Sequence, residues 1–422
     1  MKALTNRFMP IAIRIQILFF LFVFLGWGPP LFSGTIAIRG GEIHTMDGKV
    51  IRSGTILIKE GKIVEIGEDI QIPRDAEIVD ARGYMLYPGF VASSGQFSSG
   101  ENINFESFTP DASALDRFDL HGDYALFIRG GITSAYVSMP ANRVISGRGA
   151  VVRLGNSGRL SSVLNPEAAL NINLVREAVL PPMTDIFPAP ITTENPIVPS
   201  FKQYPSSSLG AFWLLTELFR FEPYSGDLAQ YFGNISSSLK TLQGRGLPLI
   251  IRCEKESEIR QAVELARALK MPLIIQRATE AYRVIDIIKN NNVSVIAEAL
   301  VKPNGQSPGG SAAGDADLEN QLANIPTLIR QGIPVAIIPD EERYLPDLLW
   351  VVQYFQKFGI SQEELFKTMT INPAKMFGLE DRIGCLGKGR DADILFLRNT
   401  AGKPLPRLEK VMIEGRIVYE EQ

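Results

Sequence analysis

Apolar and polar positions alternate near both ends of the chain, which is the pattern of strands that bury one face. Residues 54–67 (GTILIKEGKIVEIG) hold two apolar runs around Glu60-Gly61, and this arrangement predicts a β-hairpin. A second hairpin is predicted near the C-terminus, where residues 411–413 and 416–419 flank Glu414-Gly415. Because the segment between these ends has a different pattern, we expect the two ends to pair into one small β domain.

The middle of the chain has a helical period between short apolar runs. The runs predict strands at 248–251, 272–275, 293–296 and 334–338. Helices are predicted from Glu254 to Met271 and from about Asp317 to Arg330. Further on, Ser361 and Glu364 have the spacing of a capping box, and Pro373 is expected at the first position of a following helix. Uniformly apolar strands between amphipathic helices predict a parallel sheet covered by helices.

Two segments do not fit this alternation. Residues 181–205 contain many prolines and few periodic positions, so we expect a long irregular excursion there. Residues 303–314 (PNGQSPGGSAAG) form a glycine- and serine-rich loop directly after a predicted strand. In a barrel, a loop at that end borders the active-site face, so both a lid and a plain connector stay open as interpretations.

Composition and charge narrow the class of protein. The chain has 422 residues, of which 45% are hydrophobic and 21% charged, as in ordinary globular proteins. Its formal net charge is -3 and it has no long basic run, which argues against a nucleic-acid partner. Its two cysteines, Cys253 and Cys385, supply neither a disulfide scaffold nor a cysteine-based zinc site.

The first 34 residues resemble a targeting segment. Lys2, Arg7 and Arg14 precede the apolar run at residues 15–25, and Pro29-Pro30 end any helix after it. We therefore predict that residues 1–34 are a signal peptide or an N-terminal membrane anchor, and that the protein is exported to the periplasm or secreted. The apolar run is shorter than the roughly 20 residues that span a bilayer, which favours the signal peptide.

Several motifs in the chain occur together in one known group of proteins. Residues 87–91 read YPGFV, residues 145–150 ISGRGA and residues 208–212 SLGAF. Near the C-terminus, residues 370–374 (TINPA), 378–384 (GLEDRIG) and 387–394 (GKGRDADI) follow in order. Together they resemble the amidohydrolase superfamily, and in particular its imidazolonepropionase-like branch.

The resemblance implies an α/β architecture, a (β/α)8 TIM-type barrel with a small composite β-sandwich. The barrel is expected at residues 88–379, and the sandwich is expected to combine residues 35–87 with residues 380–422. This division agrees with the changes of period along the chain.

The resemblance also implies a metal site. The family hydrolyses C–N bonds of non-peptide amides, using zinc or another divalent metal to activate water. Its ligands are a His-x-His pair, a lysine or glutamate, two single histidines and an aspartate. Carried over to this chain, the His-x-His positions fall on Ser94 and Gln96, and the two single histidines fall on Arg252 and Arg277. The aspartate position falls on Asp340. The lysine or glutamate has no clear counterpart, with Ile172 as a weak candidate.

Histidines are too few for such a site. The family pattern needs four, and this chain has only His44 and His121, neither of them in a ligand position. We therefore expect no metal cofactor.

Arg252 and Arg277 have two interpretations. They can form an ion pair with Asp340 that fills the cavity left by the metal, because a lone buried charge is costly. Alternatively, the guanidinium groups can bind an anion or a carboxylate. We favour the first. Glu254 and Glu280, just past the same strands, are further possible partners of the arginines.

The other reactive residues have plain structural interpretations. Asp340 is the one candidate catalytic residue, as a general base, or it caps a helix starting near Pro346. Ser94 and Gln96 are candidate ligand-binding residues that can also bond each other or water. Cys253 is expected to point toward the helices, and His44 is expected away from the barrel mouth. His121, at or before the first barrel helix, is a weak catalytic candidate.

Two classes of function remain. In the first, which we rank ahead, the chain is an amidohydrolase relative that has lost its metal site and acts as a non-catalytic subunit, binding a small molecule at the barrel mouth or a catalytically complete homologous subunit. In the second, it is an active hydrolase of cyclic amides or similar C–N bonds, with a non-standard site at Asp340, Arg252 and Arg277.

Overall fold

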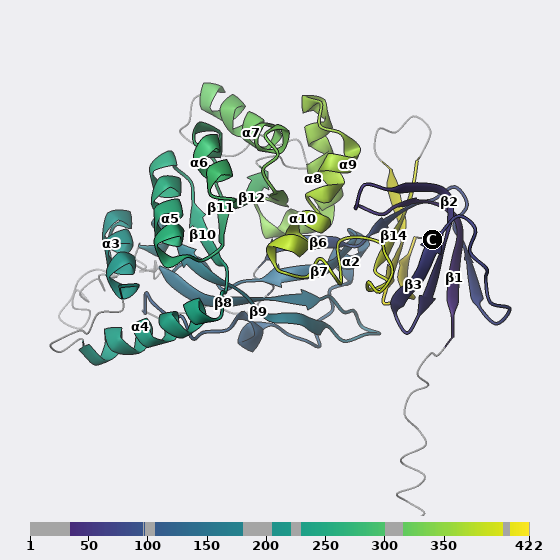
Figure 1. Ribbon diagram of the computed structural model, residues 1–422, viewed down its shortest axis with the longest axis horizontal. Helices are drawn as coiled ribbons and strands as arrows, with labels where there is room; N and C mark the ends of the chain where they lie inside the picture. The colour runs from purple at the N-terminus through teal and green to yellow at the C-terminus, as the bar shows by residue number, and fades with distance from the viewer. Residues whose placement is uncertain are drawn as a thin grey trace, which may run out of the picture.

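The computed structural model describes residues 34–95, 97, 106–179, 205–220, 229–299, 315–399 and 406–421. These residues form a helix-covered barrel and a separate sheet beside it (Figure 1). The predicted targeting segment up to residue 33, the glycine- and serine-rich loop, and the proline-rich excursion up to residue 204 lie outside the described residues.

The composite sheet contains strands from both ends of the chain. Its strands are β1 (Ile36–His44), β2 (Val50–Lys59), β3 (Lys62–Gly67), β4 (Glu77–Asp80), β5 (Met85–Pro88), β14 (Ile394–Arg398), β15 (Arg407–Ile413) and β16 (Arg416–Glu420). Strands β2 and β3 are the predicted first hairpin, and β15 and β16 are the second. The two ends meet where β14 pairs antiparallel with β5, as expected. Buried side chains such as Ile38, Ile56 and Phe396 form the core of this sheet.

The second sheet closes almost completely into a barrel. Its strands are β6 (Phe90–Gly95), β7 (Ile132–Val137), β8 (Ile145–Arg153), β9 (Ser162–Asn173), β10 (Leu249–Cys253), β11 (Leu273–Arg277), β12 (Ser294–Ala299) and β13 (Val335–Pro339). They follow one another in order around the barrel, and β13 lies against β6. Strand β8 is antiparallel to β7 and β9, whereas the other pairs are parallel. The barrel is therefore the predicted TIM type with one reversed strand.

Helices cover the outside of the parallel strands. Their bounds are η1 (Ala114–Arg117), α2 (Ala125–Arg129), η2 (Arg176–Ala178), α3 (Ser208–Leu218), α4 (Ala229–Gly244), α5 (Glu256–Leu269), η3 (Ala281–Arg283), α6 (Ile285–Asn290), α7 (Asp315–Arg330), η4 (Glu342–Asp347), α8 (Leu348–Gln353), η5 (Tyr354–Phe358), α9 (Gln362–Lys367) and α10 (Ile371–Met376). The capping box of Ser361 and Glu364 starts α9, as predicted. Pro373 is the third residue of α10 and not the first, because the helix already begins at Ile371.

Alternation along the barrel strands separates two cores. Ile250, Ile274 and Ile296 belong to a cluster inside the barrel. The next residues in each strand, such as Ile251 and Ile275, belong to the larger cluster between the barrel and the helices. Successive side chains of a strand point to opposite faces, so both faces of these strands are apolar and buried.

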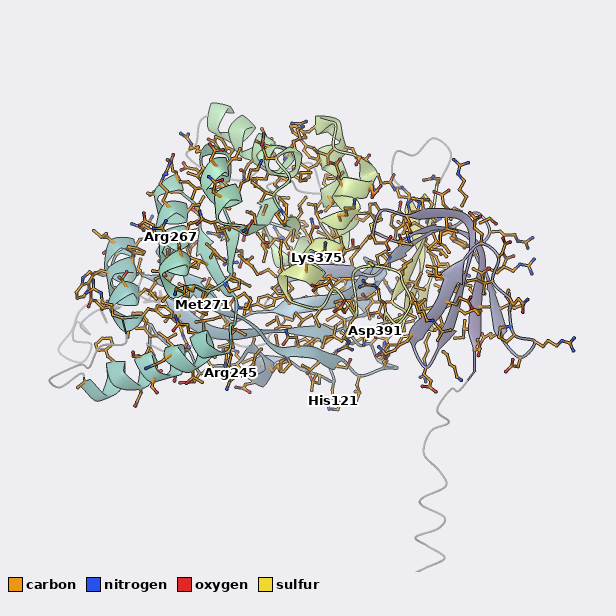
Figure 2. The ribbon with its side chains drawn as sticks, viewed as in Figure 1. His121, Arg245, Arg267, Met271, Lys375 and Asp391 are labelled. Atoms are coloured by element: carbon orange, nitrogen blue, oxygen red, sulfur yellow. The ribbon has the colours of Figure 1, made fainter. Side chains whose placement is uncertain are left out.

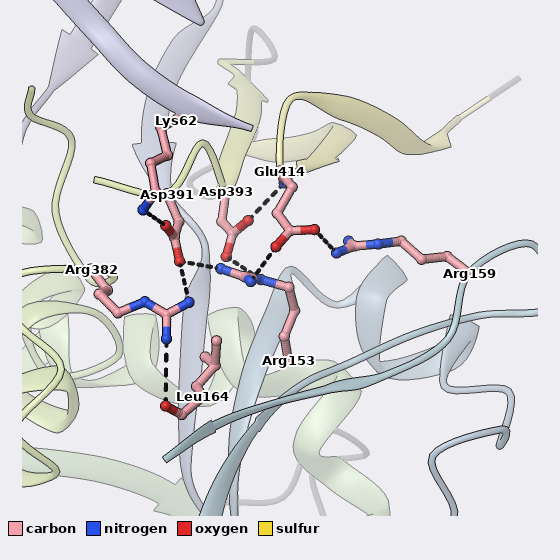
Figure 3. A network of polar contacts seen from close by, with 8 residues as sticks. All are labelled: Lys62, Arg153, Arg159, Leu164, Arg382, Asp391, Asp393 and Glu414. Atoms are coloured by element: carbon pink, nitrogen blue, oxygen red, sulfur yellow. Dashed lines mark hydrogen bonds and ion pairs between the residues drawn. The ribbon is translucent and has the colours of Figure 1, made fainter. Parts of the chain in front are cut away.

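A network of charged side chains around the buried Arg153 joins the barrel to the composite sheet (Figure 3). Arg153, the last residue of β8, is buried. Its Nη2 lies 2.6 Å from Asp391 Oδ2, its Nε 3.1 Å from Asp393 Oδ2 and its Nη1 2.6 Å from Glu414 Oε1. Lys62 of β3 also contacts Asp391, at 2.7 Å. The C-terminal motif that includes residues 387–394 thus supplies carboxylates that hold the barrel and the sheet together.

No helix within the described residues is long and apolar enough to span a membrane. The apolar run at residues 15–25 is not among those residues.

Candidate ligand site

A polar cavity of about 160 Å³ lies at the carboxyl ends of the barrel strands. Ser94, Arg252, Arg277 and Asp340, all expected at the site, line it together. In barrels of this type, functional residues collect at this end. A cavity of this size holds a molecule of about the size of benzene.

The parallel register of β10 and β11 explains which side chains face the cavity. Arg252 is paired with Gln276, and both follow by two residues a side chain inside the barrel, Ile250 and Ile274. By the same alternation Arg277 would point outward. Its backbone, however, has a φ of 73°, in the left-handed region, and its side chain lines the cavity. A left-handed backbone costs free energy for a residue other than glycine, so the fold must stabilise Arg277 in this place.

Both arginines are bridged by Glu298, a residue of β12 that the sequence analysis missed. Glu298 Oε2 accepts a hydrogen bond from Arg277 Nε at 3.0 Å, and Glu298 Oε1 lies 3.5 Å from Arg252 Nη2. The expected ion pair with Asp340 is therefore wrong, because the shared carboxylate belongs to the neighbouring strand. The sequence signal that could have identified Glu298 is a glutamate close behind an apolar run. The strand was predicted to end at residue 296, but it continues to Ala299 and includes Glu298.

Arg277 is surrounded by carboxylates. Besides Glu298 it contacts Glu254, which was a predicted partner, and Glu177 Oε1 at 3.3 Å. Burial acts to lower the pKa of Arg277, but the charges of Glu298, Glu254 and Glu177 outweigh it and raise this pKa. Glu280, the other predicted partner, instead accepts a hydrogen bond from the backbone nitrogen of Glu256 at 2.8 Å.

The positive charge of Arg252 is compensated by carboxylates much less than that of Arg277. Its one ion pair in the described part of the chain is the 3.5 Å contact with Glu298. Burial lowers the pKa of the Arg252 guanidinium, against the raising effect of the Glu298 charge. Burial also raises the pKa of Glu298, although both arginines oppose this shift. The surroundings therefore lower the pKa of Arg252 and raise the pKa of Arg277.

Asp340 follows β13 directly and lines the same cavity. It does not cap the next helix, because η4 begins at Glu342 and its N-cap is Glu341. Ser94 accepts a hydrogen bond from Gln276 Nε2 at 3.0 Å. Gln96, its predicted neighbour in the site, lies outside the described residues.

Strand β9 contributes two asparagines that the sequence analysis did not propose. Asn171 and Asn173 line the cavity, whereas Ile172, the weak candidate between them, is buried toward the helices. Asn171 Oδ1 accepts from Tyr136 Oη at 2.9 Å, and Asn173 Nδ2 donates to the carbonyl of Arg143 at 2.7 Å. These bonds hold both amides against the barrel wall.

The remaining reactive residues lie away from the cavity. Cys253 is fully buried toward the helices, as the alternation predicts. His44 stacks on Tyr87 in the composite sheet, with ring centroids 4.3 Å apart. His121 is exposed on the outside of the molecule (Figure 2).

The residues at the cavity do not fit the metal site of the fold family. Both histidines of the sequence lie elsewhere, and the described residues contain no group of three or more histidine, cysteine, aspartate or glutamate side chains arranged to hold a metal ion. Guanidinium groups, which cannot ligate a cation, stand at two of the strand ends.

Known proteins support this architecture. Residues 261–418 match the amidohydrolase family. An amidohydrolase from Thermotoga maritima superposes with a TM-score of 0.71 and 22% identity, over 92% of this chain and all of the other. The C-terminal part of this chain thus matches the amidohydrolase family, and the described chain has the fold of an amidohydrolase.

Curated relatives match this chain over different lengths. A dihydroorotase from Anaeromyxobacter dehalogenans is 39% identical over 59 residues, which are 14% of this chain and 14% of the dihydroorotase. An adenine deaminase from Moorella thermoacetica is 23% identical over 390 residues, which are 90% of this chain and 56% of the deaminase. The chain thus matches only about a seventh of the first relative and about half of the second.

Proposed function

We propose that this chain is an amidohydrolase relative that does not hydrolyse a C–N bond, and that it uses its barrel mouth to bind a small polar molecule. The observation that carries the proposal is the Arg252–Glu298–Arg277 bridge. It brings two permanent positive charges to the cavity where the family resemblance expects a divalent cation. A guanidinium attracts anions as a metal does, but it cannot bind water as a ligand and acidify it.

The cavity retains what a binding site needs. It is lined by amide, hydroxyl and charged groups, with Met139, Ile338 and Leu345 as apolar neighbours. Convergent polar groups in a concave site at the end of a barrel favour recognition of a small molecule.

The test measures metal content and turnover of the full chain. Purified without chelators, the protein is expected to contain no stoichiometric zinc, iron or manganese. It is also expected to give no saturable hydrolysis of acyl-histidine dipeptides, lactams or imidazolones. Stoichiometric metal that survives dialysis, or saturable turnover of any of these compounds, contradicts the proposal.

A second candidate function is hydrolysis by a non-standard site, which Asp340 at the cavity wall favours. Positioned beside the arginines, its carboxylate would act as general base toward water while a guanidinium binds the carbonyl oxygen. This candidate predicts that Asp340→Asn abolishes turnover, whereas Asp286→Asn, at an exposed position of α6, leaves it unchanged.

Location and partners belong to the proposal as well. The apolar run at residues 15–25 after three basic residues supports export, with or without retention of the segment as an anchor. Binding to a catalytically complete homologous subunit is the alternative to a small ligand. Co-purification with a relative that carries an intact His-x-His pair would support that alternative.

A further inference from the structure

The two arginines of the cavity differ in how their charges are compensated. Arg277 contacts three carboxylates, those of Glu298, Glu254 and Glu177. Among the described residues, the guanidinium of Arg252 has one ion pair, at 3.5 Å, with a Glu298 side chain that also accepts a hydrogen bond from Arg277. A guanidinium has five N–H donors. Arg277 is thus held by the protein itself, whereas most of the donors of Arg252 are not used by it.

Burial makes this difference costly. The side chain of Arg252 is 20% exposed, and its Nε is a buried atom with no hydrogen-bond partner among the described residues. Burial also lowers its pKa, the direction expected of a cation with insufficient negative charge around it. Buried polar groups are normally hydrogen-bonded, so an unsatisfied guanidinium beside a cavity indicates a missing partner.

We propose that Arg252 binds the carboxylate of a small monocarboxylate ligand in this cavity. This inference rests on the proposed function and names the ligand class of the same site. The planar guanidinium matches a carboxylate through two parallel hydrogen bonds.

Charge and size select a monocarboxylate. Glu298, Asp340 and Glu342 line the same cavity, so a doubly charged anion such as phosphate would be repelled more strongly than a singly charged one. The volume of about 160 Å³ admits a ligand of about six non-hydrogen atoms. Gln276 Nε2 donates one of its two hydrogens to Ser94, so the second hydrogen is available to a carboxylate oxygen of the ligand.

The test compares charged and neutral probes of the same shape. Acetate and propionate are titrated into the full chain, with acetamide and propionamide as neutral isosteres and sodium chloride at matched ionic strength. Thermal unfolding and calorimetry are the measurements, because a ligand that binds only the native state raises Tm with its concentration. We expect the carboxylates to bind and to raise Tm, and the amides and chloride to leave Tm unchanged.

Variants then assign the contact to Arg252. Arg252→Gln removes the charge and is expected to weaken carboxylate binding by about tenfold or more, the effect of losing a hydrogen bond to a charged group. Arg252→Lys keeps the charge without the planar fork and is expected to restore only part of the affinity. Arg267→Gln is the matched control, because Arg267 is exposed on the outer face of α5 (Figure 2).

Two results would overturn the assignment. Equal effects of acetate and acetamide on the unaltered protein would show that no carboxylate is recognised, and this comparison does not depend on any variant folding. Undiminished acetate binding by a folded Arg252→Gln protein would show that another residue makes the contact. Failure of the proposed function is recognised separately, by bound metal or by turnover, whether or not a carboxylate binds.

Discussion

At the scale of single residues, side-chain direction decides which groups share the cavity. Arg252 could be placed from the sequence because it directly follows the strand predicted at residues 248–251 and falls on a ligand position of the family that the chain resembles. Glu298 could not, because the end of its strand was predicted three residues too early. Arg277 reaches the cavity only through a left-handed backbone, which no hydrophobic pattern reveals. The sequence therefore identified the arginines and Glu254, but not Glu298, the carboxylate that both arginines share.

The two thiols give a prediction at this scale. Cys253 is fully buried and Cys385 is 3% exposed, and burial raises the pKa of both thiols. A raised pKa and a closed surface both reduce the amount of reactive thiolate. We expect neither cysteine to react with Ellman's reagent in the native protein at mildly alkaline pH, and both to react in denaturant. Ser237→Cys, at an exposed position of α4, provides the reactive control, and rapid labelling of the unaltered protein would contradict the prediction.

At the scale of elements, period and capping predicted most strands and helices of the parallel half of the barrel. The reversed strand β8 was not predicted, because an apolar strand reads the same in either direction. The two hairpins of the composite sheet were predicted from local patterns. The pairing of β5 with β14 joins residues about 300 positions apart, and it was predicted only through the expectation that the two ends of the chain meet. Local sequence patterns thus predict individual strands and helices, but they do not predict which distant strands pair.

The C-terminal motif contains a glycine whose role is steric. Gly384 has a φ of 81°, and a Cβ there would lie 2.6 Å from the carbonyl oxygen of Thr370. Gly378, in the same motif, has a φ of 65° but no atom within 4 Å of such a Cβ. We expect Gly384→Ala to lower the free energy of unfolding by roughly 2–4 kcal/mol and Gly378→Ala by roughly 1–2 kcal/mol, measured by urea unfolding. Equal losses in both variants would mean that the close contact with Thr370 does not matter.

At the scale of the whole molecule, the barrel and the composite sheet are held together by charges from segments far apart in sequence. Asp391 and Asp393 come from the end of the C-terminal motif, and Arg153 comes from the reversed strand of the barrel (Figure 3). The motif was interpreted from resemblance alone. The structure adds a physical reason for its two aspartates, which neutralise a buried arginine at the junction.

Replacement of Arg153 tests this junction. Arg153→Met keeps much of the side-chain volume but leaves the buried carboxylates of Asp391 and Asp393 without their shared cation. Removing one partner of a buried ion pair typically costs about 3–5 kcal/mol, so we expect a loss of this size in the free energy of unfolding. Because Lys62 and Arg382 still contact Asp391 in this variant, the loss of the cation affects Asp393 more than Asp391. Arg267→Met, the same change at an exposed position of α5, is expected to alter stability by less than about 0.5 kcal/mol. If both variants unfold at the same urea concentration as the unaltered protein, the network contributes nothing to joining the barrel and the sheet.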